Sequence, residues 1–446
     1  MNILWKYSIN VYVVLNLIIT FAVAFSTPIK NDGASARASI ISNSKVRCVD
    51  CAIIGGGPAG LSAALTISKS APSKTIAIFE RDSFQPKGAS IAISKSGWKS
   101  IKEMDPMLVK QIKKTSAPVN LVEIKPWHIE DTEKKSKRER IFKVGLSIIT
   151  FFFRLFKGAV NYTHLWHDVR TVLAGRAKEV YQHAKDDGAD LLNLNCSLEN
   201  VRPLDASDEE TQQGARFEIT VNENGRPKII HAKILIACDG SMSRVRAILP
   251  NEPDILIDEK KSVWRGITPI STNGKATFYA DKQTGRSALV FPAGKDAGAS
   301  WTVISPIQAG KSGTDAEARS RLAKVIDDLG DEEFKKAVDD SPIIIENKLQ
   351  VRDFDKPWKS SYDGLAYTGD AAHPVRPTGE GTALAFEDAK VLGEVVAKYG
   401  LSVEALRAYE DMRYEPVKRI SDEVRRLAKA SYAQLDKTNK SSTALI

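Results

Sequence analysis

Cysteine is scarce in this chain, and no metal-binding or nucleic-acid-binding motif occurs in it. The 446 residues include four cysteines, too few and too scattered for a disulfide scaffold: Cys48, Cys51, Cys196 and Cys238. Cys48 and Cys51 have CxxC spacing, but residues three apart in a strand point to opposite faces, so we interpret them as strand residues rather than a metal or redox pair. The sequence also lacks internal repeats, long low-complexity tracts and a Ser-His-Asp set. Its length suits two interleaved domains.

The positive charge of the chain is local. Of the formal net charge of +9, residues 1–47 supply +4, and residues 134–157 have eight basic residues against Glu139. The remainder has a net charge of about −2 by the same count. The isoelectric point near 9.1 therefore gives no reason to expect a nucleic-acid partner.

The pattern of the first 47 residues predicts a targeting presequence. An apolar run from about Ile9 to Phe25 ends in Ala22-Val23-Ala24, which is similar to a signal-peptidase site. The following residues 25–47 are rich in Ser and Ala and poor in acids, as transit peptides are. This two-part pattern resembles the presequences of algae with complex plastids and predicts plastid import. The alternatives are ordinary secretion and retention of the run as a membrane anchor.

A dinucleotide-binding turn follows the presequence. Val49–Ile54 is a short apolar run of the kind that forms a buried parallel strand, and Gly55–Gly60 (GGGPAG) comes directly after it. In G-x-G-x-x-G, the glycines permit the tight turn, the approach of a pyrophosphate and close packing of helix on strand. A second strand, Thr75–Phe79, ends at Glu80, where an acid is expected to bind adenosine ribose hydroxyls. The expected cofactor contacts are Gly55, Gly57, Pro58, Ala59, Gly60 and Glu80.

Two further segments have the same strand-then-turn character. Cys238–Arg246 (CDGSMSRVR) follows an apolar strand and leads into a helix start at Ser243. Tyr367–Ala389 (YTGDAAHPVRPTGEGTALAFEDA) ends a strand at Gly369-Asp370 and enters a helix from about residue 382 to 398.

In this order and spacing, the three segments resemble the FAD-dependent aromatic-ring hydroxylases, over roughly residues 48–430. The resemblance implies an α/β fold, in which a Rossmann-like FAD-binding domain is interleaved with a mixed-sheet substrate domain of the p-hydroxybenzoate-hydroxylase type and followed by C-terminal helices. It implies that Asp370 binds the ribityl chain and that the helix start near Thr382 faces the flavin. The cofactor-binding residues that it adds are Asp239, Arg246, Gly369, Asp370, Pro377, Gly379, Gly381 and Thr382.

The chain departs from the family pattern at two positions. Trp166 stands where members often have an FAD-binding arginine, so no such arginine is carried over, and Ala383 replaces the usual asparagine. His373 is interpreted as a structural part of its motif, since the sequence offers it no second titratable partner. Residues 264–266 (Trp-Arg-Gly) and Phe291-Pro292 stand where the family places pocket-facing residues, and ordinary sheet positions would explain them equally well.

The expected domain organisation is discontinuous. The FAD-binding domain comprises residues 48–120, 161–255 and 345–398, and residues 256–344 form the substrate-domain sheet. Residues 121–160 are an inserted basic and apolar helical region, and residues 399–446 form C-terminal helices. In residues 141–160, Lys143, Arg154 and Lys157 fall on one side of a helix and leave a wide apolar face with five phenylalanines, and a basic run lies just upstream. That pattern fits a helix in an anionic membrane surface and fits equally a lid over the substrate domain.

The resemblance implies an external flavoprotein monooxygenase. NADPH or NADH would reduce FAD, O2 would form a flavin C4a-hydroperoxide, and one oxygen would pass to a small aromatic or isoprenoid substrate, giving a phenol or an epoxide. One alternative is a flavin-dependent reductase of the geranylgeranyl-reductase type; a halogenase would need a WxWxIP signature that is absent. The other is a non-catalytic flavin-binding, membrane-associated protein. No catalytic residue and no metal is expected, and the sequence does not indicate an oligomeric state.

Overall fold

The computed structural model describes residues 46–86, 89–128, 162–184, 190–205, 208, 214–281, 283–306, 315–377 and 379–442. Every element below belongs to the unit Arg47–Ile446. The presequence, apart from its last two residues, and the basic part of the insert, residues 134–160, lie outside the described residues. Among the helices that are described, none is long and apolar enough to cross a membrane.

A seven-stranded sheet organises the first half of the fold. Its order is β7-β2-β1-β10-β9-β8, with β16 also paired to β10. Strands β7, β2, β1, β10 and β16 run parallel to one another, so their carboxyl ends lie at one edge. Strand β9 pairs antiparallel with both β10 and β8. The bounds are β1 Arg47–Ile54, β2 Ile76–Phe79, β7 Leu192–Asn193, β8 Cys196–Pro203, β9 Phe217–Glu223, β10 Arg226–Ala237 and β16 Leu365–Tyr367.

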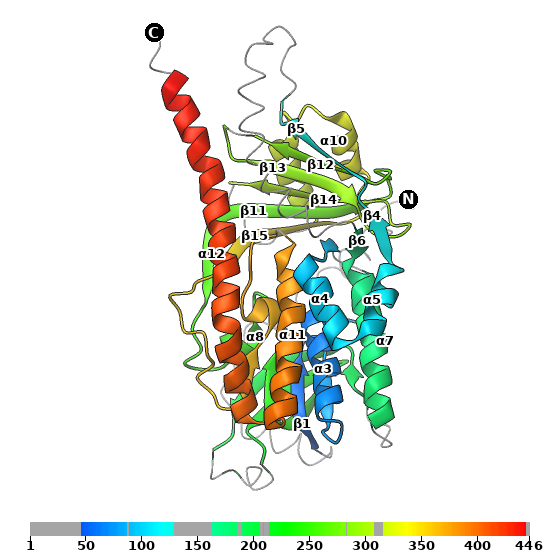
Figure 1. Cartoon of the computed structure of the whole chain (residues 1–446), viewed down its shortest axis with the longest axis vertical. Coiled ribbons are helices and arrows are strands. Elements are labelled where there is room, and N and C mark those ends of the chain that lie inside the picture. The colour runs from blue at the N-terminus through cyan, green and yellow to red at the C-terminus, as the bar shows by residue number, and fades with distance from the viewer. Residues whose placement is uncertain are drawn as a thin grey trace, which may run out of the picture. The chain divides into compact units, whose positions relative to one another are not determined.

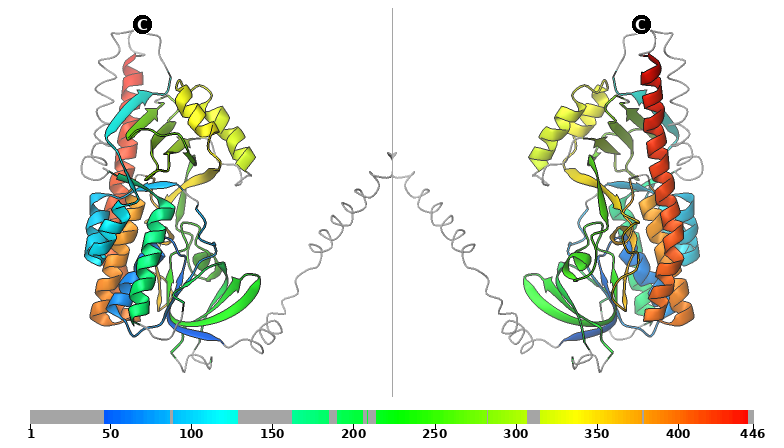
Figure 2. Two further views of the ribbon diagram at one scale, coloured as in Figure 1. Left: turned by 90° about the vertical axis from the view of Figure 1, so that its right-hand side faces the viewer. Right: turned by 90° about the vertical axis from the view of Figure 1, so that its left-hand side faces the viewer.

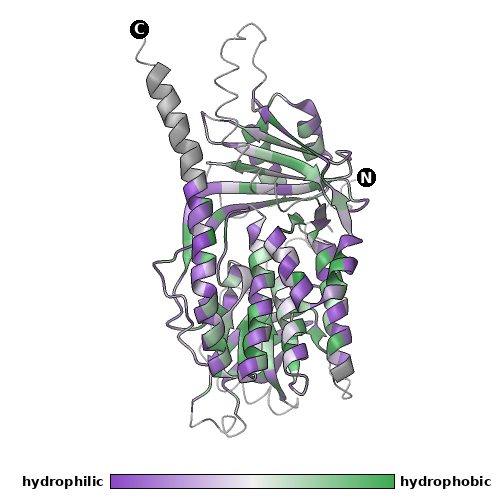
Figure 3. Cartoon of the chain, in the orientation of Figure 1, coloured by the Kyte–Doolittle hydropathy of each residue, from purple (hydrophilic) through white to green (hydrophobic). Residues whose placement is uncertain are grey.

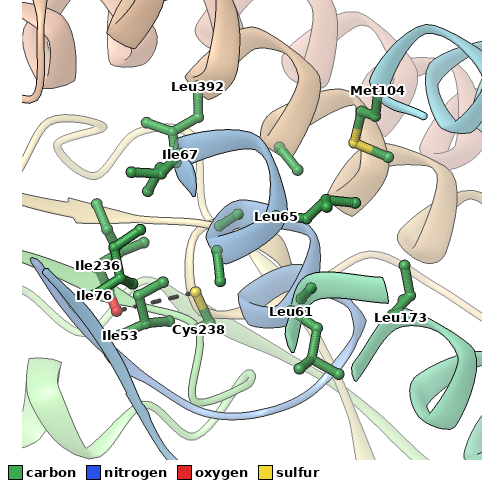
Figure 4. Close-up of a cluster of buried hydrophobic side chains, with 14 of the residues drawn as sticks. Ile53, Leu61, Leu65, Ile67, Ile76, Met104, Leu173, Ile236, Cys238 and Leu392 are labelled. Carbon is green, nitrogen blue, oxygen red and sulfur yellow. Dashed lines mark hydrogen bonds between the residues drawn. The ribbon is translucent and has the colours of Figure 1, made fainter. Parts of the chain in front are cut away.

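Helices cover one face of this sheet (Figures 1 and 2). Helix α3 lies against the strands, and its residues Gly60–Ser68 are all buried. Apolar side chains from β1, β2, β10, α3, α7 and α11 form one core there, with Ile53, Leu61, Leu65 and Leu392 among its members (Figure 4). The helices are α3 Pro58–Ser70, α4 Lys95–Met104, α5 Pro106–Lys113, α7 Trp166–Ala184, α11 Glu380–Tyr399 and α12 Val403–Ser442.

A six-stranded sheet forms the second half, in the order β15-β11-β14-β13-β12-β5. Helices α9 and α10 pack on one of its faces, over a core that includes Trp264, Trp301 and Phe334. Hydrophobic and hydrophilic residues alternate along many of the helices and strands (Figure 3), as expected for elements with one face toward a core. The bounds are β5 Leu121–Pro126, β11 Leu256–Thr268, β12 Lys275–Ala280, β13 Ser287–Pro292, β14 Ala299–Ser305, β15 Ile344–Arg352, α9 Asp315–Ile326 and α10 Glu332–Asp339.

Smaller elements join the two halves. A three-stranded sheet, β3-β6-β4, lies between them, and the short helices α8 and η3 follow the carboxyl ends of β10 and β16. The bounds are β3 Ser90–Ala92, β4 Ser116–Pro118, β6 Tyr162–Leu165, α8 Arg244–Ile248 and η3 Gly369–Ala371.

Two predicted domain boundaries are wrong. Leu121–Pro126, expected in the helical insert, is a strand that pairs in parallel with β12. Ile344–Arg352, most of which was expected in the FAD-binding domain, pairs antiparallel with β11. Both segments are edge strands of the six-stranded sheet, and their pairing partners lie far away in sequence, which local patterns do not reveal.

Candidate cofactor site

The three sequence segments meet at the carboxyl edge of the parallel strands. Gly55, at φ +105°, lies so close to Cys238 that an added Cβ would be 2.4 Å from the Cys238 carbonyl oxygen. A Cβ on Gly369 would be 2.8 Å from the Cβ of Ala59. The turn after β1 therefore packs directly against the turns after β10 and β16. Crevices at the carboxyl ends of parallel strands are where open α/β sheets bind ligands.

Gly57 and Gly60 differ in what surrounds them. A Cβ on Gly60 would be 2.0 Å from the Gly55 carbonyl oxygen, so Gly60 is required for close packing of α3 on the turn. Gly57 has φ −77°, and the nearest atom to its added Cβ is Cζ2 of Trp166 at 3.8 Å. Among the described residues, no atom excludes a side chain at Gly57. Pro58 and Ala59 open α3, whose N-terminus has no side-chain cap, so this position has the space and the N–H groups that a pyrophosphate requires.

Glu80 stands at the end of β2, beside the turn. One of its carboxylate oxygens accepts a hydrogen bond of 2.7 Å from the Gly56 N–H, and the other accepts one of 2.9 Å from Asp82 N–H. The Arg170 guanidinium lies 3.1 Å from the Glu80 carboxylate and donates a 2.7 Å hydrogen bond to the Gly56 carbonyl. The acid is thus held at the place where an adenosine ribose is expected, and it is mostly buried.

Arg170 is a site residue that the sequence interpretation missed. It is fully buried, its guanidinium carbon lies 3.7 Å from the ring centroid of Phe84, and it also lies over the Trp166 ring at 5.0 Å. Arg170 follows Trp166 by four residues on α7, so the two share one helix face. This four-residue spacing could have identified Arg170 from the sequence. An arginine four residues after Trp166 lies on the same face of the helix and can reach the same glycine-rich loop, Gly55–Gly60, that Trp166 adjoins.

Hydrogen bonds within the second segment, Cys238–Arg246, stabilise its turn. Asp239 accepts a 3.0 Å hydrogen bond from Val245 N–H through one oxygen, while its other oxygen is buried without a partner among the described residues. Burial raises the pKa of Asp239. Ser243 caps α8, as predicted, by accepting a hydrogen bond from Arg246 N–H. The second oxygen of Asp239 is an acceptor that could receive a ligand donor.

Arg246 contacts protein groups in this structure. Its guanidinium pairs with Glu252 at 3.1 Å, donates to the Ala371 carbonyl at 3.3 Å and lies 3.7 Å above the Tyr367 ring. Arg246 is 8% exposed. It braces the third segment against the second, and its predicted contact with cofactor stays a prediction.

Asp370 of η3 and Arg265 of β11 belong to different halves of the fold and interact electrostatically. The Asp370 side chain is accessible to solvent, yet desolvation by the surrounding protein raises its pKa, opposed by the positive charges of His373 and Arg265. Desolvation likewise lowers the pKa of Arg265, and attraction to Asp370 opposes it. Asp370 is thus accessible to solvent but surrounded by protein atoms on several sides, and we call this position, beside η3 and near Arg265 of β11, the recess.

The start of α11 borders the same recess. Gly379 occupies the N-cap position at φ +90°, without a side-chain cap, and its added Cβ would be 3.8 Å from Ala92. A Cβ added to Gly381 would lie 3.6 Å from a carboxylate oxygen of Asp370. Thr382 is partly exposed and Pro377 is exposed. The uncapped helix N-terminus leaves backbone N–H groups available where negative charge on a reduced flavin would be stabilised.

Ala383 is buried behind this helix start. A Cβ on Gly97 of α4 would lie 3.0 Å from the Cβ of Ala383, so α4 and α11 approach closely at this pair. The residue that replaces the family's asparagine therefore serves helix packing here.

His373 has the titratable partner that the sequence did not reveal. Its Nε2 lies 2.6 Å from the Asp388 carboxylate, and that carboxylate also accepts a 2.8 Å hydrogen bond from Gly369 N–H and a 2.7 Å bond from Arg413. Burial opposes ionisation of Asp388, but His373 and Arg413 outweigh it and hold its pKa at about 2. His373 is fully buried and stacks on Trp358 at 6.1 Å between ring centroids. These contacts agree with a structural role for His373.

The open face of the six-stranded sheet has the composition of a substrate floor. Trp264 is fully buried on the face that α9 and α10 cover, whereas Arg265 points to the opposite face because strand residues alternate. Strand register places one partly exposed row across that opposite face: Ile124, Phe278, Leu289, Thr302, Arg265 and Ile345. Of the residues 264–266, only Arg265 is a candidate for the pocket, since an added Cβ on Gly266 would meet the Trp301 ring at 2.4 Å. Phe291 is partly exposed and Pro292 is buried.

Comparison with known proteins identifies the family. The family model described as "FAD binding domain" matches residues 195–424, more than half of the chain. This chain belongs to the FAD-dependent aromatic-ring hydroxylase family. It is 23% identical over 393 residues to salicyloyl-CoA 5-hydroxylase from Streptomyces sp, covering 84% of this chain and 63% of that protein. It is 25% identical over 225 residues to phenazine 1,6-dicarboxylic acid hydroxylase PhzS from Lysobacter antibioticus, covering 47% of this chain and 55% of that protein.

Solved structures agree with the predicted fold. Klebsiella pneumoniae HpxO, complexed with FAD and uric acid, superimposes with a TM-score of 0.63 over 87% of this chain and 91% of that one, at 17% identity. The fold is therefore of the p-hydroxybenzoate-hydroxylase type, and the cofactor of this family is FAD. The chain spans less than two thirds of the length of either curated relative.

Proposed function

We propose that this protein is an FAD-dependent monooxygenase that uses NADPH or NADH and O2 to hydroxylate or epoxidise a small aromatic or isoprenoid substrate. One observation carries the proposal. The turns after β1, β10 and β16 pack together at one edge of the parallel sheet, and Asp370 there is near enough to Arg265 of the open sheet face for their charges to interact. A cofactor held along the three turns would thus meet a substrate lying on the sheet.

The residues present fit FAD. The space at Gly57 and the uncapped start of α3 would receive the pyrophosphate, Glu80 the adenosine ribose and Asp370 the ribityl chain. When bound, FAD supplies hydride acceptance and activation of O2. The chain itself orients both molecules and supplies backbone N–H groups at the start of α11.

The open sheet face supports an apolar substrate with a polar group. Four of the six residues in the row are aliphatic or aromatic, and Arg265 supplies the charge. Burial of apolar surface would exclude water from the reacting atoms. Arg265 would fix the orientation of an oxygen-bearing group, and we assign no acid–base residue to the reaction.

The cellular address remains a proposal from the sequence. Residues 1–47 support import into a plastid, and in a plastid an isoprenoid or quinone-like substrate is favoured. Fluorescent fusion of residues 1–47 in an alga with a complex plastid tests this. Secretion of the fusion into the medium would support the ordinary secretory alternative.

Oxygen incorporation tests the proposed reaction. Candidate phenols and isoprenoids are incubated with the FAD-loaded protein, NADPH or NADH, and labelled O2. We expect one labelled oxygen atom per product molecule and consumption of one reduced nicotinamide. Reduction of a substrate double bond without O2 consumption would instead support the flavin-dependent reductase, and absence of turnover with every substrate class would support the non-catalytic protein.

A further inference from the structure

Helices α4 and α5 expose a concentration of lysines that the proposed reaction does not use. Residues 95–114 contain six lysines and two acids. Asp105 is buried and pairs with Lys69 at 2.9 Å and Arg176 at 2.6 Å. Glu103 contacts Lys390 at 3.1 Å and Lys99 at 3.8 Å. The six lysines, here called the lysine face, are all exposed: Lys95, Lys99, Lys102, Lys110, Lys113 and Lys114.

The lysine face is presented by a rigid corner of the fold. Helix α4 buries Ile101 and Met104, and α5 buries Leu108, so the lysines project from the opposite sides of both helices. Asp105 caps α5 by accepting a 2.9 Å hydrogen bond from Met107 N–H, while its carboxylate also binds α3 and α7 through the two cations named above. Both helices lie on the outer side of the helical layer, away from the seven-stranded sheet (Figure 2). The positive charge is therefore held outward.

The chemistry of this surface favours lipid headgroups over nucleic acid. Neither helix contains an arginine, and lysine ammonium groups are mobile point charges suited to a diffuse layer of phosphates. Sequence or single-strand recognition of nucleic acids uses arginine forks and stacked aromatic rings. Met107, between the lysines, is 52% exposed and offers an apolar side chain to a membrane interface.

The lysine face adjoins the point where the basic insert returns to the fold. Helix α5 leads into β4, and Pro118 of β4 pairs with Tyr162 of β6, the first residue described after the insert. Residues 134–157 contain eight basic residues. Tyr162 is 38% exposed. The described chain thus resumes at Tyr162 beside Pro118, four positions beyond Lys114.

We propose that the lysine face docks the protein onto a membrane surface rich in anionic phospholipids. Clustered lysines near such a surface act together, and salt screens their attraction. The docking is independent of FAD.

Vesicle flotation tests the proposal. Residues 47–446 contain the two hydrophobic cores described above and a third, in which strands of the seven-stranded sheet pack with Val245 and Leu249. This protein is loaded with FAD and floated with phosphatidylcholine vesicles with or without phosphatidylserine. The test variant is Lys102→Glu with Lys110→Glu and Lys114→Glu. The matched control, Lys324→Glu with Lys336→Glu and Lys348→Glu, changes charge equally at three exposed lysines of α9, α10 and β15.

We expect flotation that requires phosphatidylserine, is lost at high salt, falls at least about tenfold in the lysine-face variant and persists in the control. Flavin absorbance shows that each variant has folded. Equal flotation of the lysine-face variant and the native protein would overturn the proposal, because the insert alone would then suffice. Loss in both variants, no flotation of the native protein, or tighter binding to duplex DNA than to vesicles would also overturn it.

Discussion

Gly57 and Gly60 lie three residues apart in one turn, but different partners explain them. Gly60 is required by the protein, since an added Cβ would lie 2.0 Å from a carbonyl oxygen. Gly57 has an ordinary φ and open space beside it. We propose that a glycine is needed here for a ligand, because a bound pyrophosphate would approach the backbone at this position.

Gly57→Val should therefore fold normally and fail to bind FAD. We expect an unchanged urea midpoint and loss of the yellow colour, because the side chain occupies the pyrophosphate position. Gly60→Ala is the matched control, and it should lose about 3 kcal/mol of unfolding free energy through overpacking. Flavin absorbance after gel filtration and urea unfolding measure the two effects. A Gly57→Val protein with its full complement of FAD would contradict the site assignment.

At the scale of elements, a buried charge network joins η3, α11 and α12. Asp388 on α11 accepts hydrogen bonds from Gly369 N–H and from Arg413 of α12, and it pairs with His373. The carbonyls of Ala371 and Ala372 accept hydrogen bonds from Arg246 and Arg352. The turn that would contact the flavin is thereby fixed by hydrogen bonds from α8 and β15 and, through Asp388, from α12.

Asp388→Asn should destabilise the protein at neutral pH by about 3 kcal/mol, because it leaves buried positive charges without their partner. The pKa of Asp388 is lowered to about 2 in the folded protein. Its stabilisation is therefore complete above the ordinary carboxyl pKa and disappears as pH falls from about 4 toward 2. Urea unfolding of native and variant protein at pH 7 and at pH 3 measures this. A difference between the two proteins that stays constant over this range would argue against an ionised Asp388.

At the scale of the whole molecule, the two sheets supply different parts of the proposed reaction site. Asp370 lies at the cofactor edge and Arg265 on the open face of the six-stranded sheet, and their charges interact. We propose that substrate bound on the sheet face changes the surroundings of the cofactor.

We therefore expect hydride transfer from NADPH or NADH to be faster by at least about tenfold when substrate is bound. Anaerobic stopped-flow measurement of flavin bleaching, with and without substrate, determines the two rates. Arg265→Met should remove much of the substrate effect while leaving FAD bound. Rapid, complete bleaching without substrate in the native protein would contradict this coupling and favour the reductase.

The sequence alone determined the fold class, the cofactor and the order of the site segments. These depend on local chemistry: a strand that ends in Gly55–Gly60, an acid at Glu80 and a helix start near Thr382 can each be recognised from adjacent residues. The structure confirms the predicted strands β1, β2, β10 and β16 and the helix cap at Ser243. It also confirms that Cys48 and Cys51 point in opposite directions, since Cys48 is exposed and Cys51 is buried.

Only the tertiary structure decided the long-range relations. The Arg170–Glu80 pair, the partner of His373 and the assignment of β5 and β15 to the six-stranded sheet join residues that are 15 to 154 positions apart. Packing and hydrogen bonding between distant segments create these contacts, and no local pattern encodes them. The recess between Arg265 and Asp370 is of the same kind, since strand alternation leaves either face of β11 available until α9 and α10 cover one of them.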